Sequence, residues 1–408
     1  MDDLIIVGAG WAGLSAAAFA RHKQPNAKIR LIAQGIGSPI ITPGWLSVLD
    51  SATGDVLAAV RDLIACHPEH PYALAGAAAL ESALRLFAQI STEIGLGYRA
   101  DLPLHNAHVF TALGASQTPA VLPYGYQGAA QAGAQPLFVG FAGWRDYYPA
   151  LSGGHFALIT PPIGNRPWDL TPTDYARHFD QPAFRAEVAR LVKVNLNGAT
   201  SVAFPAVLGL EQHAEVVQAL QKQLGVPVFE LPTLPPSVPG TRLFNGLRRY
   251  LLDRRVRVQV GHPVGRGVLE GKRVLGVEVI AAGKPQFFGA KAVILATGNL
   301  YGGGLFSDDY GRVWEGIFGI PVQYVADRQQ WFNAHMLDER GHAVHHFGVG
   351  ANAQMQPLDA DGAPLAENLF VAGHIMAHPD SAPSPFETAE GVALATAYRA
   401  VELALMQP

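Results

Sequence analysis

Three glycines near the N-terminus have the spacing that binds a phosphate through backbone amides. The run Gly8-Ala9-Gly10-Trp11-Ala12-Gly13 matches G-x-G-x-x-G, between an expected strand (residues 4–7) and an expected helix (residues 11–22). The first glycine permits a tight turn, the second lets the backbone approach a phosphate, and the third lets helix and strand pack closely. The amides and dipole of the helix start, at Trp11 and Ala12, favour the bound anion. The pattern predicts a nucleotide-binding site.

The residue expected to face a ribose is Gln34, at the end of a second strand predicted over residues 28–33. Dinucleotide-binding folds usually place an acid there to hold the ribose hydroxyls. Glutamine can hydrogen-bond a hydroxyl but lacks the charge that strengthens such bonds. The sequence therefore predicts an adenosine ribose less firmly than an acid would. Both FMN, which has no adenosine, and FAD remain possible cofactors.

Two later strands end in small residues at which a ligand can approach bare backbone. One strand, residues 292–296, runs into Thr297 and Gly298, and the other, residues 368–372, runs into Gly373. Ligands of open α/β sheets bind at the carboxyl ends of parallel strands. Together with the N-terminal turn, this grouping is typical of two-domain flavoproteins.

The last helix, expected over residues 387–406, is the remaining cofactor candidate. A helix N-terminus near Gly391 and Val392 would stabilise negative charge on the pyrimidine of a reduced flavin. Glu387 and Glu390 lie in the same turn and are expected to cap the helix.

Histidines and one arginine are the candidates for substrate chemistry. The candidate bases are His345, His346, His374 and His378, because histidine titrates near neutrality. Arg242 follows a proline-rich loop at the start of a predicted helix, and its guanidinium suits a substrate phosphate. The histidines lack the spacing of a zinc site, so no metal is expected.

Composition narrows the range of partners. Apolar residues make up 49% of the 408 residues and charged residues 15%. The net charge is −4 and the sequence has no long basic run, so nucleic acid is not an expected partner. Cys66 is the single cysteine, so an iron–sulfur cluster would have to lie in another chain. The N-terminus is acidic and apolar stretches fall short of the ~20 residues of a membrane span. We expect a cytoplasmic protein that contacts a membrane only through a partner.

The order of expected elements predicts an α/β, Rossmann-like two-domain fold. The flavin-binding domain is expected to be discontinuous, from residues 1–50, 240–304 and 341–408. Residues 51–239 are expected to form an inserted α/β substrate domain, and residues 305–340 a cap-like connection.

Over most of its length the chain resembles the flavoprotein B subunits of anaerobic glycerol-3-phosphate dehydrogenases. The segment Leu-Pro-Thr-Leu-Pro-Pro-Ser-Val is the most specific part, because no general rule of folding demands it. The resemblance rests on residues 8–13, 43–49, 70–72, 231–238, 296–298, 302–304, 347–349 and 367–373.

The resemblance implies a nucleotide-binding core like that of glutathione reductase and fumarate reductase. It also implies a flavin, with FMN favoured and FAD as the alternative, and it adds Gly44 to the cofactor-binding residues. Together with a catalytic A subunit, the family oxidises sn-glycerol 3-phosphate, a small phosphorylated polyol, to dihydroxyacetone phosphate. Electrons pass to a quinone through a membrane-anchoring iron–sulfur subunit.

Two departures from the family leave alternatives open. The family has a glycine- and cysteine-rich turn where this chain has residues 387–390, and glutamines where it has His345 and His346. One alternative is a self-sufficient flavoprotein reductase with another substrate. The other is a non-catalytic subunit that holds flavin or acts as a scaffold.

Overall fold

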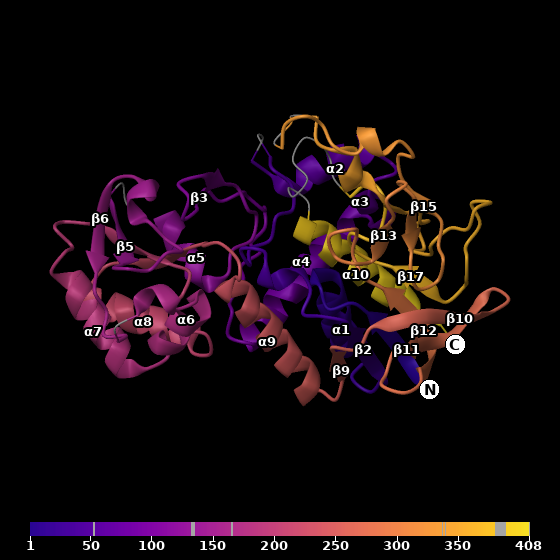
Figure 1. Ribbon diagram of the computed structural model, residues 1–408, viewed down its shortest axis with the longest axis horizontal. Coiled ribbons are helices and arrows are strands. Elements are labelled where there is room, and N and C mark those ends of the chain that lie inside the picture. The colour runs from indigo at the N-terminus through magenta and orange to yellow at the C-terminus, as the bar shows by residue number, and fades with distance from the viewer. Residues whose placement is uncertain are drawn as a thin grey trace.

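The chain folds around two hydrophobic cores, each built on a sheet rich in parallel strands (Figure 1). The computed structural model describes residues 1–51, 54–131, 135–164, 166–336, 338, 340–379 and 389–407. Helix α9 (Val238–Asp253) runs between the two parts. The arrangement confirms the expected α/β class.

The larger sheet has the strand order β10-β11-β12-β1-β2-β9, with β17 also paired to β12. In its parallel portion, residues 4–7 of β1 are apolar and buried, and β2 is buried throughout although it contains Arg30. Its members are β1 (Asp2–Val7), β2 (Ile29–Ala33), β9 (Arg257–Val260), β10 (Val264–Glu270), β11 (Arg273–Val279), β12 (Gln286–Leu295) and β17 (Leu369–Val371).

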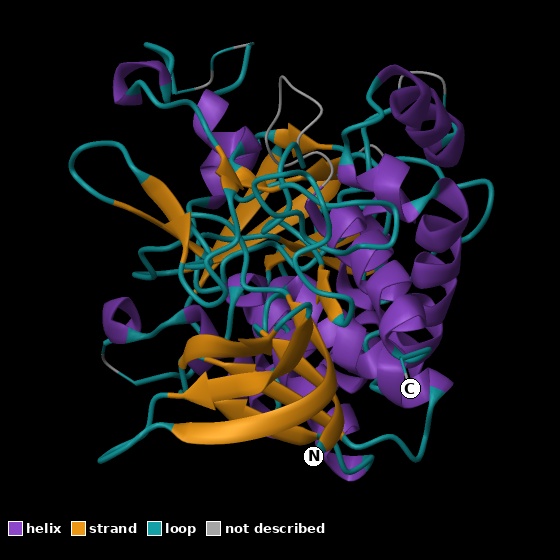
Figure 2. Cartoon of the chain, turned by 90° about the vertical axis from the view of Figure 1, so that its right-hand side faces the viewer, coloured by secondary structure: helices purple, strands orange, loops and turns teal. Residues whose placement is uncertain are grey.

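Helices cover this sheet on one side, as Figure 2 shows. The alanine-rich α1 is buried over most of its length, packed against α10 and α4, because its small side chains permit close approach. The helices of this part are α1 (Trp11–Lys23), α2 (Val56–Cys66), α3 (Pro71–Ala75), α4 (Ala77–Glu93) and α10 (Ala389–Ala404).

The smaller sheet is fully parallel, with the order β6-β5-β7-β8. Its strands are β5 (Pro136–Phe141), β6 (His155–Ile159), β7 (Ser201–Pro205) and β8 (Val228–Leu231). Around it lie α5 (Tyr124–Gln131), α6 (Pro172–Phe179), α7 (Pro182–Lys193) and α8 (His213–Leu224). A short hairpin, β3 (Val109–Phe110) and β4 (Ser116–Gln117), precedes it.

The cores divide the chain differently from the expected boundary at residue 51. The second core begins at residue 112 and ends at residue 231. Helices α2 to α4 belong instead to the first core, because the apolar face of α4, with Leu80, Leu84 and Phe87, packs there.

The expected cap-like connection, residues 305–340, also packs on the first core, through Leu305, Val313, Ile320 and Trp331. Its secondary structure is short. It comprises β13 (Leu305–Ser307), β14 (Val313–Glu315), the turn η4 (Arg328–Gln330), and β15 (Val322–Gln323), which pairs with β16 (Gly348–Val349).

Candidate functional site

The three glycine-bearing turns lie together because the strands before them are neighbours. In the parallel register, Val7 pairs with Leu295, and Leu295 pairs with Val371. Each strand ends at this level, so Gly8, Thr297 and Gly373 follow at one edge of the sheet. We call these turns, residues 8–13, 297–304 and 373–374, the glycine cradle.

The first and third glycines of the N-terminal turn are required by the packing of the protein itself. Gly8 has a φ of +114°, and a Cβ there would lie 2.2 Å from the carbonyl oxygen of Ala296. A Cβ on Gly13 would lie 1.9 Å from the carbonyl oxygen of Gly8. Gly10 is different, since a Cβ there would meet Ser38 Oγ at 3.4 Å and nothing nearer. The protein does not need a glycine at position 10, which leaves the approach of a ligand as its reason.

The start of α1 beside Gly10 has the properties of an anion site. No side chain caps it, and its first turn holds no acid. The side chains of Trp11 and Ala12 are buried, so a ligand would meet their backbone amides rather than their side chains. Gln34, the expected ribose contact, is exposed immediately after β2. Gly37 was not among the residues predicted from the sequence. It packs against the N-terminal turn, where a Cβ on Gly37 would lie 2.6 Å from Gly10 N.

The second turn offers a buried hydroxyl. Thr297 Oγ1 is buried without a hydrogen-bond partner among the described residues. Gly298 has a φ of +80°, and the loop to Gly304 folds back so tightly that a Cβ on Gly304 would lie 1.9 Å from Gly298 O. Buried polar atoms normally find partners, so the lone hydroxyl indicates a ligand.

The third turn closes the cradle against α1. Gly373 has a φ of +75°, its N–H donates to Thr396 Oγ1 at 2.8 Å, and a Cβ there would lie 2.7 Å from Ala12 Cβ. The open backbone at Gly10, the uncapped helix start and the lone Thr297 hydroxyl fit a phosphate-bearing cofactor.

The predicted histidines border the cradle. His345 and His346 end the turn η5 (Ala343–His346), and the His345 ring lies 6.0 Å from the ring of Tyr301, in the 297–304 turn. The chain after His346 runs beside the chain after His374, where the Val349 N–H donates to Ile375 O at 2.8 Å. The fold thus brings together segments that the sequence keeps about 30 to 75 residues apart.

His345, His346 and His374 are held in the neutral form near pH 7. Burial lowers the pKa of His374 to about 4. Burial, with the neighbouring His342 and His346, lowers the pKa of His345, and burial with His378 lowers that of His346. A neutral imidazole is the form that accepts a proton.

The structure places three other cofactor candidates in tightly packed surroundings. Gly44 has a φ of +84° and lies against α9, where a Cβ would be 2.8 Å from Pro239 Cβ. The Gly391 N–H donates to Ser47 O at 2.9 Å, and a Cβ there would lie 2.0 Å from Tyr72 Oη. Val392 is fully buried in the core.

Glu390 is buried at the first turn of α10. Its Oε2 accepts a hydrogen bond from Ser47 N at 3.0 Å, so it ties α10 to the 41–50 loop. Burial raises the pKa of Glu390 to about 7, although the Ser47 N–H opposes the shift. Glu387, the other expected cap, lies outside the described residues.

A Glu390→Gln substitution should change how stability depends on pH. The folded-state pKa of Glu390 lies above its ordinary 4.5, so its contribution is present below pH 4.5 and is lost as the pH rises through 7. The loss amounts to about 3 kcal/mol. Glutamine can keep the Ser47 bond, so urea unfolding should show the variant gaining on the parent between pH 5 and pH 8. A difference that is constant across this range would contradict the assignment.

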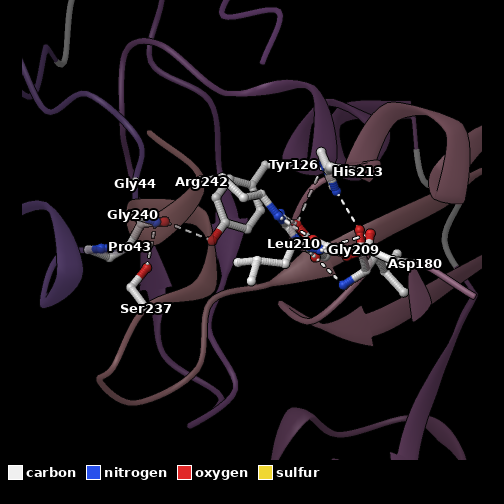
Figure 3. Close-up of polar contacts among 12 residues, drawn as sticks. Pro43, Gly44, Tyr126, Asp180, Gly209, Leu210, His213, Ser237, Gly240 and Arg242 are labelled. Carbon is white, nitrogen blue, oxygen red and sulfur yellow. Dashed lines mark hydrogen bonds and ion pairs between the residues drawn. The ribbon is translucent and has the colours of Figure 1, made fainter. Parts of the chain in front are cut away.

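Arg242 is engaged in polar contacts with other residues of the protein (Figure 3). Its guanidinium is buried and forms two bonds to the carboxylate of Glu230, at 2.7 and 2.8 Å, and a third to Gly209 O at 2.6 Å. Each of its three nitrogens already donates a hydrogen bond within the protein and its charge is paired with Glu230, so the geometry does not support phosphate binding. The sequence feature that could have indicated this pair is Glu230, an acid within the otherwise apolar strand Val228–Leu231.

The ion pair also sets the charge of its neighbours. Burial opposes the charge of Glu230, but Arg242, His213 and the Leu208 N–H together outweigh it and hold the pKa of Glu230 below its usual value. Burial and then the charge of Arg242 lower the pKa of His213 to about 4. His213 is therefore neutral beside the pair, 3.8 Å from Glu230 Oε2.

Membrane-spanning helices and metal-binding clusters are absent from the part of the chain that the structure describes. No helix in this part of the chain is both long and apolar enough to cross a bilayer. No group of three or more histidine, cysteine or acidic side chains there could hold a metal ion.

Comparison with known proteins gives a family match and named relatives. Residues 3–159 and 176–382 match the family model described as FAD binding domain. The chain is 30% identical to the probable B subunit of the anaerobic glycerol-3-phosphate dehydrogenase of Halobacterium salinarum, over 98% of this chain and 96% of that protein. It is 28% identical to the corresponding B subunit of Vibrio vulnificus, over 99% of this chain and 96% of that one.

Among solved structures, the chain is similar to 3-ketosteroid Δ1-dehydrogenase from Sterolibacterium denitrificans, with 12% identity, full coverage of both chains and a TM-score of 0.49. The family match confirms the expected flavoprotein fold and flavin binding, and it indicates FAD. FMN, which the resemblance favoured, receives no support.

Proposed function

The chain belongs to the family formed by the B subunits of anaerobic glycerol-3-phosphate dehydrogenases, and from this premise we propose that it is the FAD-carrying member of a multi-subunit dehydrogenase. The complex would oxidise sn-glycerol 3-phosphate to dihydroxyacetone phosphate. Electrons would pass to a quinone through an iron–sulfur partner, which also makes the contact with the membrane. The observation that carries the proposal is Gly10, whose missing side chain opens the cradle at an uncapped helix start.

In this proposal the chain has two tasks. Gly10, Thr297 and the start of α1 hold the cofactor, and FAD, when bound, supplies the hydride acceptor. A neutral histidine, His345, His346 or His374, takes the hydroxyl proton as the carbinol becomes a carbonyl. Low pKa values suit this role, because a protonated imidazole cannot accept the proton.

The engaged guanidinium of Arg242 favours a second candidate. This chain would then relay electrons through FAD, and the catalytic partner would bind and oxidise the phosphorylated substrate. The two candidates differ in what the histidines do.

Single substitutions to glutamine in the assembled complex separate the candidates. If this chain oxidises the substrate, substitution of at least one of His345, His346 and His374 should reduce dye-linked turnover of sn-glycerol 3-phosphate by about 100-fold or more. The FAD content of that variant should be unchanged. The acidic limb of the parent's pH profile should then lie below pH 6.5, the ordinary histidine pKa. Unchanged turnover in all three variants would favour the relay role, and a purified chain without flavin would contradict both.

A further inference from the structure

The smaller sheet has an open edge on the side of the second core away from the larger sheet (Figure 1). Strand β6 ends the order β6-β5-β7-β8 and, among the described strands, pairs with β5 alone. The strand at the other end, β8, is buried along its whole length. An unpaired edge presents a row of backbone donors and acceptors to which another strand can bond.

The backbone groups that face outward on β6 are those of Phe156 and Leu158. Ala142 N donates to Ile159 O at 2.8 Å, so the carbonyl of Ile159 points toward β5. Because successive residues of a strand direct their N–H and C=O groups to opposite edges, Phe156 and Leu158 point away from β5. Within the part of the chain that the structure describes, neither makes a backbone hydrogen bond to another segment.

The same two residues carry large apolar side chains in contact with water. Phe156 and Leu158 are 45% and 59% exposed, and they lie on one face of the sheet because they are two residues apart. The short turn η2 (Pro149–Ser152) packs on this strand, and its Leu151 is itself 57% exposed. The open edge is therefore bordered by an apolar surface.

The sequence of β6 contains none of the features that usually protect an exposed edge. Natural edge strands are shielded by a lysine, a proline or a bulge. Residues 153–160 contain no acid, lysine, arginine or proline, and β6 pairs with β5 without a register shift. The terminal strands of the larger sheet, in contrast, carry Arg257 on β9 and Arg266 on β10. Strand β6 is thus open to pairing with another uncharged strand.

The edge is complementary to itself. When two copies of β6 run antiparallel about an axis through Ala157, Phe156 of one copy lies opposite Leu158 of the other. Both residues face outward, so each such pair exchanges two backbone hydrogen bonds. Each pair also brings two exposed apolar side chains together on the same face of the joined sheet. Since residues 153–160 carry no acid, lysine or arginine, no like charges from those side chains oppose this contact.

From this complementarity we infer that two copies of the chain form a symmetric dimer through β6, which joins their smaller sheets into one. The strand belongs to the second core, whereas the turns of the glycine cradle follow strands of the larger sheet. The dimer therefore goes beyond the proposed function and does not depend on it.

Sedimentation equilibrium of the FAD-loaded full chain measures the dimer directly. At micromolar concentration the parent should have twice the chain mass of 43.4 kDa. Phe156→Lys and Leu158→Glu, made singly, should each weaken the dimer at least about 10-fold, because each places a charge opposite an apolar side chain. Ile280→Lys is the matched control, since Ile280 is 57% exposed but follows β11 of the larger sheet, and it should leave the dimer unchanged.

The double variant Phe156→Lys/Leu158→Glu tests the register. In the antiparallel pairing each introduced lysine faces an introduced glutamate, so the double variant should recover most of the affinity that the single variants lose. A monomeric parent, a dimer that the single variants leave intact, or a double variant that associates no better than the single variants would each overturn the inference. A monomeric parent whose β6 variants instead lose a partner subunit would assign the edge to that subunit and equally overturn it. FAD content, which these exposed substitutions should not change, reports separately on the proposed function.

Discussion

A Gly10→Val variant should lose FAD, with at least about 100-fold weaker retention, while the apo chain keeps its thermal stability. A Cβ at this position would meet only Ser38 Oγ, at 3.4 Å, and the φ of −74° suits any residue. The valine side chain would instead occupy the space through which a phosphate reaches the amides of α1. Absorbance of the bound flavin and thermal unfolding of the apo chain measure the two effects separately.

Gly8 provides the contrast. A side chain there meets the carbonyl oxygen of Ala296 at 2.2 Å and needs a φ of +114°, so Gly8→Val should lose both flavin and stability. Full FAD occupancy in the Gly10→Val protein would remove the cradle as the cofactor site.

An Arg242→Met variant should lose about 3–5 kcal/mol of stability, because it leaves the carboxylate of Glu230 buried without its partner. The effect should be large because the pair joins β8 of the second core to α9, whose apolar face packs in the first core. The midpoint of urea unfolding measures the loss.

A second variant separates this ion pair from a substrate site. Adding Glu230→Gln to Arg242→Met removes the buried charge while glutamine can still accept from Leu208 N, so it should restore a substantial part of the lost stability. In the folded complex, the KM for sn-glycerol 3-phosphate should stay within about 2-fold of the parent. A KM that rises at least 10-fold would return Arg242 to the phosphate site.

Sequence patterns sufficed to predict several helices and strands and the glycine-bearing turn after β1. The apolar residues 4–7 predicted β1, the largely apolar residues 28–33 predicted β2, and the strand–glycine–helix order predicted the turn at Gly8 to Gly13. These features depend on local periodicity and on the conformations open to glycine, which are properties of short segments.

The sequence by itself therefore determined the α/β class, the family and the N-terminal half of the cradle. Only the tertiary structure decided that Arg242 pairs with Glu230, that Glu390 is buried against Ser47, and that β6 lies at the open edge of its sheet. Ser47 and Glu390 are 343 residues apart in the chain. Desolvation and ion pairing depend on what surrounds a side chain after distant segments have packed, and no local pattern of residues carries that information.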